Sequence, residues 1–193
     1  MRRCASIALC VIALFTFSGA AWAQAVATDE ARAFTIADGA FSLEAPSGWK
    51  RVAPKSGIVE TEFAIPSEGD LAAGRMTVMG AGGTVQANVD RWYGQFTQPD
   101  GSATKDKATS KTLKLAGCTV TLVDVAGTYK DMPGGPFAGG QAVERPDYRM
   151  LAAIVETPGR GSYFLKLYGP GATVAKHADG FRKMVEGLVA AAK

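Results

Sequence analysis

The fold is decided by residues 147–168, DYRMLAAIVETPGRGSYFLKLY, which predict two adjoining strands and a tight turn. The first half places apolar side chains on both faces of an extended chain, a pattern typical of a strand that is covered on both sides. The Pro158-Gly159 pair then ends this strand and provides turn geometry. The chain returns as SYFLKLY, rich in the aromatic and aliphatic residues that favour strands. The stretch therefore predicts an antiparallel hairpin at the centre of a sheet.

The N-terminus has the features of a secretory signal peptide. Two arginines precede an apolar run over 5–17, and the small-x-small sequence AWA ends at Ala23. We predict cleavage after Ala23, which would remove residues 1–23 and export the protein to the periplasm or the medium. The apolar run is shorter than the roughly 20 residues that span a bilayer, so we expect no stable membrane insertion. Residues 24–33 are small and unpatterned and predict a flexible tether, which leaves 34–193 as a single domain.

Cleavage would leave Cys118 as the only thiol, so no internal disulfide is possible and the domain must depend on its core. Cys118 alternates with Val120 and Leu122, which predicts a buried and unreactive side chain. Loss of Arg2-Arg3 lowers the formal net charge from +3 to +1. Such a nearly neutral protein is a poor candidate for binding nucleic acid or anionic membranes.

Five further segments alternate apolar and polar residues as strands do. They are 41–45, 58–65, 75–79, 110–115 and 118–129, of which the last two are joined by Ala116-Gly117 as a second hairpin. In segment 58–65 the alternation predicts one buried face and one wet face. We expect Glu60 and Glu62 to lie on the wet face.

Two segments have the apolar spacing of amphipathic helices. Thr84 is a suitable N-cap for a helix over 85–96, and Thr173 is a suitable N-cap for a C-terminal helix. The C-terminal stripe consists of Val174, Ala178, Phe181, Val185 and Leu188. Together these elements predict an α+β domain, an antiparallel sheet flanked by helices.

Two segments lack a regular pattern and are predicted to be loops. Residues 97–109 contain a Pro-Asp-Gly turn signal, and residues 131–146 are rich in glycine and proline. The second loop exposes Met132 and Phe137, which are our candidate partner contacts. The alternative is that Phe137 plugs the end of the sheet.

The sequence offers little catalytic chemistry. His177 is the only histidine, it lies beside the apolar stripe of the C-terminal helix, and no nucleophile motif accompanies it. We therefore predict no catalytic residues, no metal site and no cofactor. A small hydrolase that uses His177 remains the alternative from another functional class.

Three stretches carry a resemblance to a known family. FSLEAPSGW (41–49), NVDRWYGQF (88–96) and YFLKLYGP (163–170) look like an uncharacterised family of exported bacterial proteins. That family is similar in layout to the PsbP-like fold of the photosystem protein PsbP and the periplasmic lipoprotein DcrB. The resemblance implies an antiparallel sheet sandwiched by helices and a non-enzymatic role, and it supplies no catalytic residues.

We expect an exported accessory or binding module that is a monomer, with an unknown protein or small ligand as its partner. A small-ligand carrier with a pocket under the 131–146 loop is a further alternative.

Overall fold

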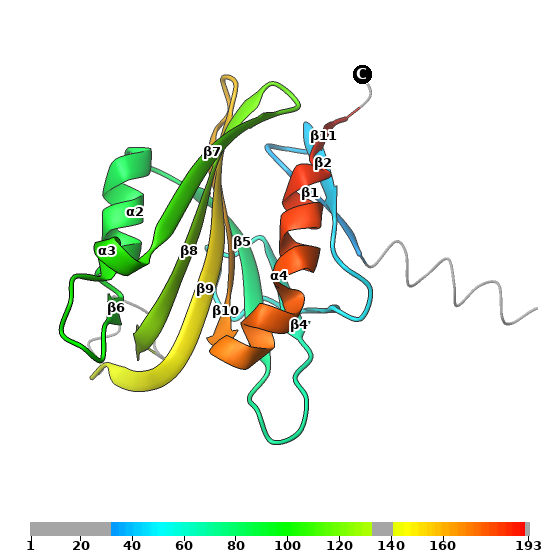
Figure 1. Cartoon of the computed structure of the whole chain (residues 1–193). Coiled ribbons are helices and arrows are strands. Elements are labelled where there is room, and N and C mark those ends of the chain that lie inside the picture. The colour runs from blue at the N-terminus through cyan, green and yellow to red at the C-terminus, as the bar shows by residue number, and fades with distance from the viewer. Residues whose placement is uncertain (1–31, 133–140, 192–193) are drawn as a thin grey trace, which may run out of the picture. The chain divides into compact units, whose positions relative to one another are not determined.

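The computed structural model describes residues 32–132 and 141–191, in which the chain forms two antiparallel sheets and three helices (Figure 1). The predicted signal sequence and Phe137 lie outside these residues. Among the described residues, no helix has the length and apolar character needed to cross a bilayer. The α+β class and the antiparallel pairing are confirmed.

The larger sheet has the order β3-β4-β5-β10-β9-β8-β6, with β7 also paired to β8. Its strands are β3 (Lys50–Val52), β4 (Thr61–Ile65), β5 (Gly74–Ala81), β6 (Phe96–Thr97), β7 (Thr109–Leu115), β8 (Cys118–Asp131), β9 (Val143–Thr157) and β10 (Gly161–Pro170). The predicted hairpins are confirmed as β9–β10 and β7–β8. Strand β3 was not predicted, because its three residues are too few to show alternation.

The central strands are covered on both faces, as the pattern of residues 147–168 predicted. In β9, Leu151 and Ala153 belong to one buried cluster, whereas Ala152 and Ile154 belong to another. Burial on both faces explains why this strand is a nearly continuous apolar run.

One face of the large sheet is covered by α4 (Gly171–Glu186) and by the small sheet of β1 (Ala33–Ile36), β2 (Phe41–Glu44) and β11 (Val189–Ala190). All five residues of the predicted C-terminal stripe are buried. The predicted N-cap was wrong, because the helix begins at Gly171 with Pro170 as its N-cap. Thr173 lies inside the helix and donates its hydroxyl to the Ala72 carbonyl. We call this side the α4 face.

The opposite face is covered by α2 (Val85–Tyr93) and the short helix α3 (Thr104–Lys107), which lie on the other side of the sheet from α4 (Figure 1). Trp92 packs edge-on against Phe164, with ring centroids 5.0 Å apart. The prediction that the helix reaches residue 96 was wrong, because Gly94 ends it and Phe96 pairs with Tyr129 as strand β6. We call this side the α2 face.

The expected loop over 97–109 also differs from the structure, because it contains α3. The Thr104 hydroxyl donates to the Phe96 carbonyl at 2.9 Å and so ties α3 to β6. Gly127 has φ 145° and lies so close to β6 that an added Cβ would meet the Thr97 carbonyl oxygen at 2.6 Å. Glycine is required at this irregular point of β8, where the register shifts between Gly127 and Tyr129.

Two strand predictions need correction. Strand β4 begins at Thr61 rather than at Ile58, and Glu62 is only 2% exposed, so the predicted wet face is not wet along its whole length. The physical reason is that Arg75 and the backbone at Lys55 cover this carboxylate, since Arg75 donates to both of its oxygens and the Lys55 N–H donates to Oε2 at 3.2 Å. The 131–146 loop is also shorter than predicted, because β8 continues to Asp131, where it pairs with Val143 of β9.

Candidate functional site

A cavity of about 350 Å³ lies on the α4 face, between the C-terminal half of α4 and strands β7, β8 and β9. Its apolar floor is formed by Leu122 of β8, Leu151 of β9 and Phe181 of α4. Leu122 is opposite Lys111 of β7, and Leu151 is opposite Asp124 of β8, so the strand register brings floor and rim together. The cavity therefore has an apolar base and a charged border.

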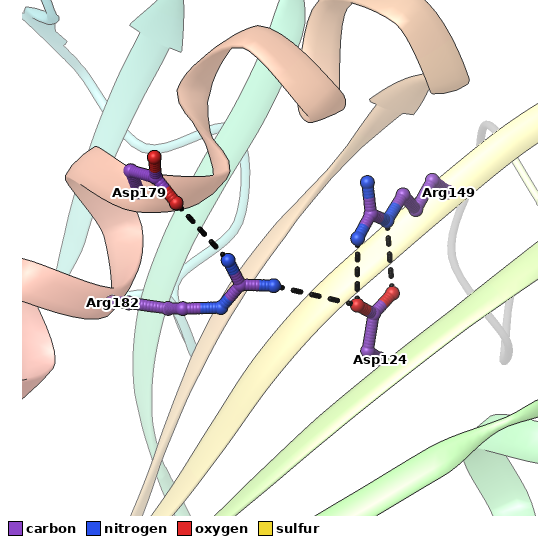
Figure 2. A network of polar contacts seen from close by, with 4 residues as sticks. All are labelled: Asp124, Arg149, Asp179 and Arg182. Carbon is purple, nitrogen blue, oxygen red and sulfur yellow. Dashed lines mark hydrogen bonds and ion pairs between the residues drawn. The ribbon is translucent and has the colours of Figure 1, made fainter.

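The border of the cavity is organised by an ion-pair network, shown in Figure 2. Arg149 donates from Nε and Nη2 to the two carboxylate oxygens of Asp124, at 2.8 and 2.6 Å. Arg182 of α4 lies 3.8 Å from Asp124 Oδ2 and donates to Asp179 Oδ1 at 3.1 Å. The network connects β8, β9 and α4 at the border of the cavity.

Asp124 serves in this network as a fixed acceptor. Its hydrogen bonds raise the pKa of the Arg149 guanidinium above the ordinary arginine value. Both oxygens of Asp124 accept from Arg149, and Arg182 lies close to one of them. Because both oxygens are already engaged, this geometry suits positioning rather than acid-base catalysis.

The rim also carries charges that the network does not use. Lys111 and Glu186 line the cavity and are exposed, and neither has an ion pair with another described residue. The network of Asp124, Asp179, Arg149 and Arg182 carries no net charge, and Lys111 and Glu186 balance each other, so the border as a whole is neutral. Lys111 is a cation of this border that has no ion pair with another described residue and could bind an anionic group. A ligand with an apolar group and a carboxylate is the best match for this combination.

A second polar group lies on the α2 face, and we call Glu62, Arg75, Tyr168 and Lys166 the α2-side cluster. Arg75 donates to both oxygens of Glu62 at 2.7 and 2.8 Å, which lowers the pKa of Glu62. Arg75 also donates to the Tyr168 hydroxyl at 2.7 Å. The Lys166 ammonium lies 5.5 Å from the Trp92 ring centroid, and burial, with smaller contributions from Arg91 and Arg75, lowers its pKa to about 8.

The structure places His177 in a purely structural setting. Its Nδ1 accepts from the Trp49 indole at 3.1 Å, and its Nε2 lies 2.9 Å from the Pro66 carbonyl oxygen. Because an indole N–H only donates and a carbonyl only accepts, His177 is the neutral Nε2–H tautomer with both nitrogens engaged. This arrangement does not favour a general base.

Of the remaining residues that the sequence singled out, Cys118 and Met132 do not line the cavity. Cys118 is buried as predicted, and burial raises the pKa of its thiol. Met132 is 47% exposed at the end of β8, and Phe137 lies outside the described residues. Their role as partner contacts stays a prediction. Across residues 32–132 and 141–191, no three His, Cys, Asp or Glu side chains are grouped so as to hold a metal ion.

Sequence reasoning did not find the cavity residues. The signal was present in Asp124 and Arg149, which are charges within two segments that were predicted to be strands, 118–129 and 147–155. An isolated charge in such a strand requires a partner. The sequence did not indicate that α4 brings Arg182 close to Asp124, because this contact joins residues that are 58 positions apart.

Comparisons with known proteins concern the fold. No protein-family model and no curated protein matches the chain. Among solved structures, the chain is similar to the solution structure of cyanobacterial PsbP (CyanoP) from Synechocystis sp. PCC 6803. The identity is 11% and the TM-score 0.50, and the match covers 82% of this chain and 91% of that one.

A further similar structure is that of PA94 from Pseudomonas aeruginosa, described as a protein of unknown function and putative regulator. Here the identity is 12% and the TM-score 0.44, with 83% of this chain and 97% of that chain covered. At identities this low the likeness concerns the backbone, and the match to CyanoP confirms the layout that the sequence resemblance implied. The chain therefore has a PsbP-like fold.

Proposed function

We propose that this chain is an exported binding module, and that the cavity beside α4 receives an apolar group of its partner or ligand. The observation that carries the proposal is the floor of Leu122, Leu151 and Phe181, which opens between charged side chains. Ligand pockets usually measure about 300–1,000 Å³, so a cavity of about 350 Å³ suits one small apolar group.

Ion pairs connect the elements that surround the cavity, which favours binding. Asp124, Arg149 and Arg182 connect two strands and the helix around it. A site that is already ordered loses little conformational entropy when a ligand enters. The polar rim then supplies orientation, and the apolar floor supplies most of the affinity.

The structure supports the two alternative functions, hydrolase and small-ligand carrier, to different degrees. The hydrolase reading has little support, because both ring nitrogens of His177 are engaged by Trp49 and Pro66. The small-ligand carrier reading draws on the same cavity, although none of the described residues of the 131–146 segment lines it. A free small molecule and a side chain of a partner protein would use the same floor.

The cavity proposal is tested with a set of small apolar carboxylates, screened by ligand-observed NMR. Leu122→Trp fills the cavity, and Val52→Trp places the same side chain on β3, at the opposite end of the large sheet. We expect binding to the unchanged protein and to Val52→Trp, and about tenfold or weaker binding to Leu122→Trp, a difference of about 1.4 kcal/mol or more. Melting curves check that Leu122→Trp is folded, and equal binding to all three proteins would refute the cavity.

The export part of the proposal rests on the signal-like sequence before Ala23. N-terminal sequencing of the protein recovered outside the cytoplasm should begin at Gln24. A protein that retains Met1, or that stays in the cytoplasm, would contradict export and leave the cavity proposal untouched.

A further inference from the structure

Strand β7 has a free edge. It pairs with β8 on one side, and among the described residues no strand pairs with its other side. All seven of its residues are exposed or half-buried. An exposed edge offers unpaired backbone N–H and C=O groups to another extended segment.

The turn before β8 determines which backbone groups are free. Strands β7 and β8 are joined by the two-residue turn Ala116-Gly117, with φ of 50° and 82°, and Leu115 is opposite Cys118. In a hairpin of this type the residues that flank the turn exchange both backbone hydrogen bonds, and such pairs then alternate along the strands.

It follows that Lys111 and Leu113 direct their backbone groups toward β8. Ser110, Thr112 and Lys114 direct theirs outward, at the free edge. Three consecutive outward positions can form a ladder with an added strand. Ser110 and Lys111 also line the cavity, with Lys111 opposite Leu122 on the α4 face, so the free edge and the cavity adjoin.

The charge of β7 indicates what kind of strand it accepts. The strand has two lysines, Lys111 and Lys114, and no carboxylate, and Arg182 lies across the cavity from it. Pairing with β7 of a second copy would bring four lysines close together, which is unfavourable. An acidic segment would instead find cations on both faces of the edge.

We infer that β7 accepts an extended acidic segment of another protein as an added strand, and that an apolar side chain of this segment enters the cavity. The inference rests on the proposed function, because it uses the same cavity. Neighbouring strands lie about 4.8 Å apart, so a long apolar side chain on the α4 face of the added strand can pass Lys111 and enter the cavity from its β7 side.

The experiment uses a display library of random twelve-residue peptides, selected on the purified protein. We expect the selected peptides to be acidic, rich in β-branched residues, free of proline at their centre, and to contain a large apolar residue. Thr112→Pro removes one outward N–H and leaves the β8 pairing intact, since Thr112 does not bond to β8. We expect it to weaken the binding of the selected peptides at least about tenfold, whereas Thr112→Val keeps the N–H and should change binding less than about threefold.

Ser110→Pro, a second outward position, serves if Thr112→Pro does not fold. Lys111→Glu should weaken the binding of the acidic peptides, and the loss of affinity should grow as the salt concentration is lowered. Lys50→Glu on β3 is the control for this charge change. Selected peptides that are basic, or that bind equally to Thr112→Pro, would overturn strand addition. If peptides that overturn strand addition still bind Leu122→Trp more weakly than the unchanged protein, the cavity proposal is retained. If they bind Leu122→Trp and the unchanged protein equally, both proposals fail. A selection dominated by copies of the β7 sequence would indicate self-association instead.

Discussion

Each face of the large sheet carries an arginine–carboxylate pair of the same geometry, but the two carboxylates differ in their exposure to solvent. On the α2 face, Arg75 holds Glu62 with two hydrogen bonds, and the carboxylate is 2% exposed. On the α4 face, Arg149 holds Asp124 in the same way, but the carboxylate is 27% exposed and borders the cavity. From this difference we propose that an arginine–carboxylate pair contributes mainly to stability on the α2 face, and that on the α4 face it helps to bind a ligand or partner.

The largest expected effect is on the sealed side. Glu62→Gln leaves the Arg75 guanidinium without its carboxylate, and breaking a pair whose carboxylate is 2% exposed should cost about 3 kcal/mol of unfolding free energy. Glu60→Gln is the control, since Glu60 is an exposed residue that accepts one hydrogen bond, from the Gly80 N–H. Urea unfolding at pH 7 measures both, and a loss below 1 kcal/mol for Glu62→Gln would remove the distinction between the faces.

Lowering the pH should cause a similar loss of unfolding free energy. Arg75 lowers the pKa of Glu62 in the folded protein, so the contribution of this carboxylate is fully present above the unfolded pKa of about 4.5. It disappears as the pH falls through the lower folded value. Glu62→Gln should therefore show a flatter stability profile below pH 4.5 than the unchanged protein.

A smaller effect is expected at Lys166, whose ammonium lies between Trp92 and Tyr168. Its pKa falls from 10.5 to about 8 on folding, so between these values the unfolded chain binds more protons and stability rises with pH. We expect the unfolding free energy to increase by about 2 kcal/mol between pH 7 and 9.5 at this site, given 1.36 kcal/mol for each pKa unit. Lys166→Met should remove this rise and stabilise the protein at pH 7, whereas parallel pH profiles would contradict the account.

The smallest effect on stability is expected on the open side. Asp124→Asn weakens a pair whose members are about a quarter exposed, so solvent screening should limit the cost to about 1 kcal/mol. The same urea measurement applies. A loss as large as that of Glu62→Gln would show that the cavity network is a stability element like its counterpart.

Local patterns account for most of the fold. The turn residues Pro158-Gly159 and Ala116-Gly117 predicted both hairpins, and the spacing from Val174 to Leu188 predicted the buried stripe of α4. These features depend on neighbours in the sequence. Gly94 could have indicated the end of α2, but the helix was predicted to continue to residue 96 because Phe96 fits the apolar spacing.

The errors and the cavity share one physical cause. Glu62 was expected in water because alternation shows that a strand has two faces, but not what packs against the second. The cavity likewise depends on where α4 ends over β7, β8 and β9, which no local pattern specifies. The sequence resemblance predicted the arrangement of sheet and helices, and the similarity to the CyanoP structure confirmed it. The cavity is formed by side chains of this chain, which a shared fold does not specify.

The most direct test of the account is to map a bound apolar carboxylate on the isotope-labelled protein by backbone amide chemical shifts. We predict the largest changes at Leu122, Leu151 and Arg182 around the cavity, and no comparable change at Trp92 or Lys166 on the α2 face. Changes centred on the α2 face, or spread evenly over both faces, would contradict the claim that the open face is the one that binds.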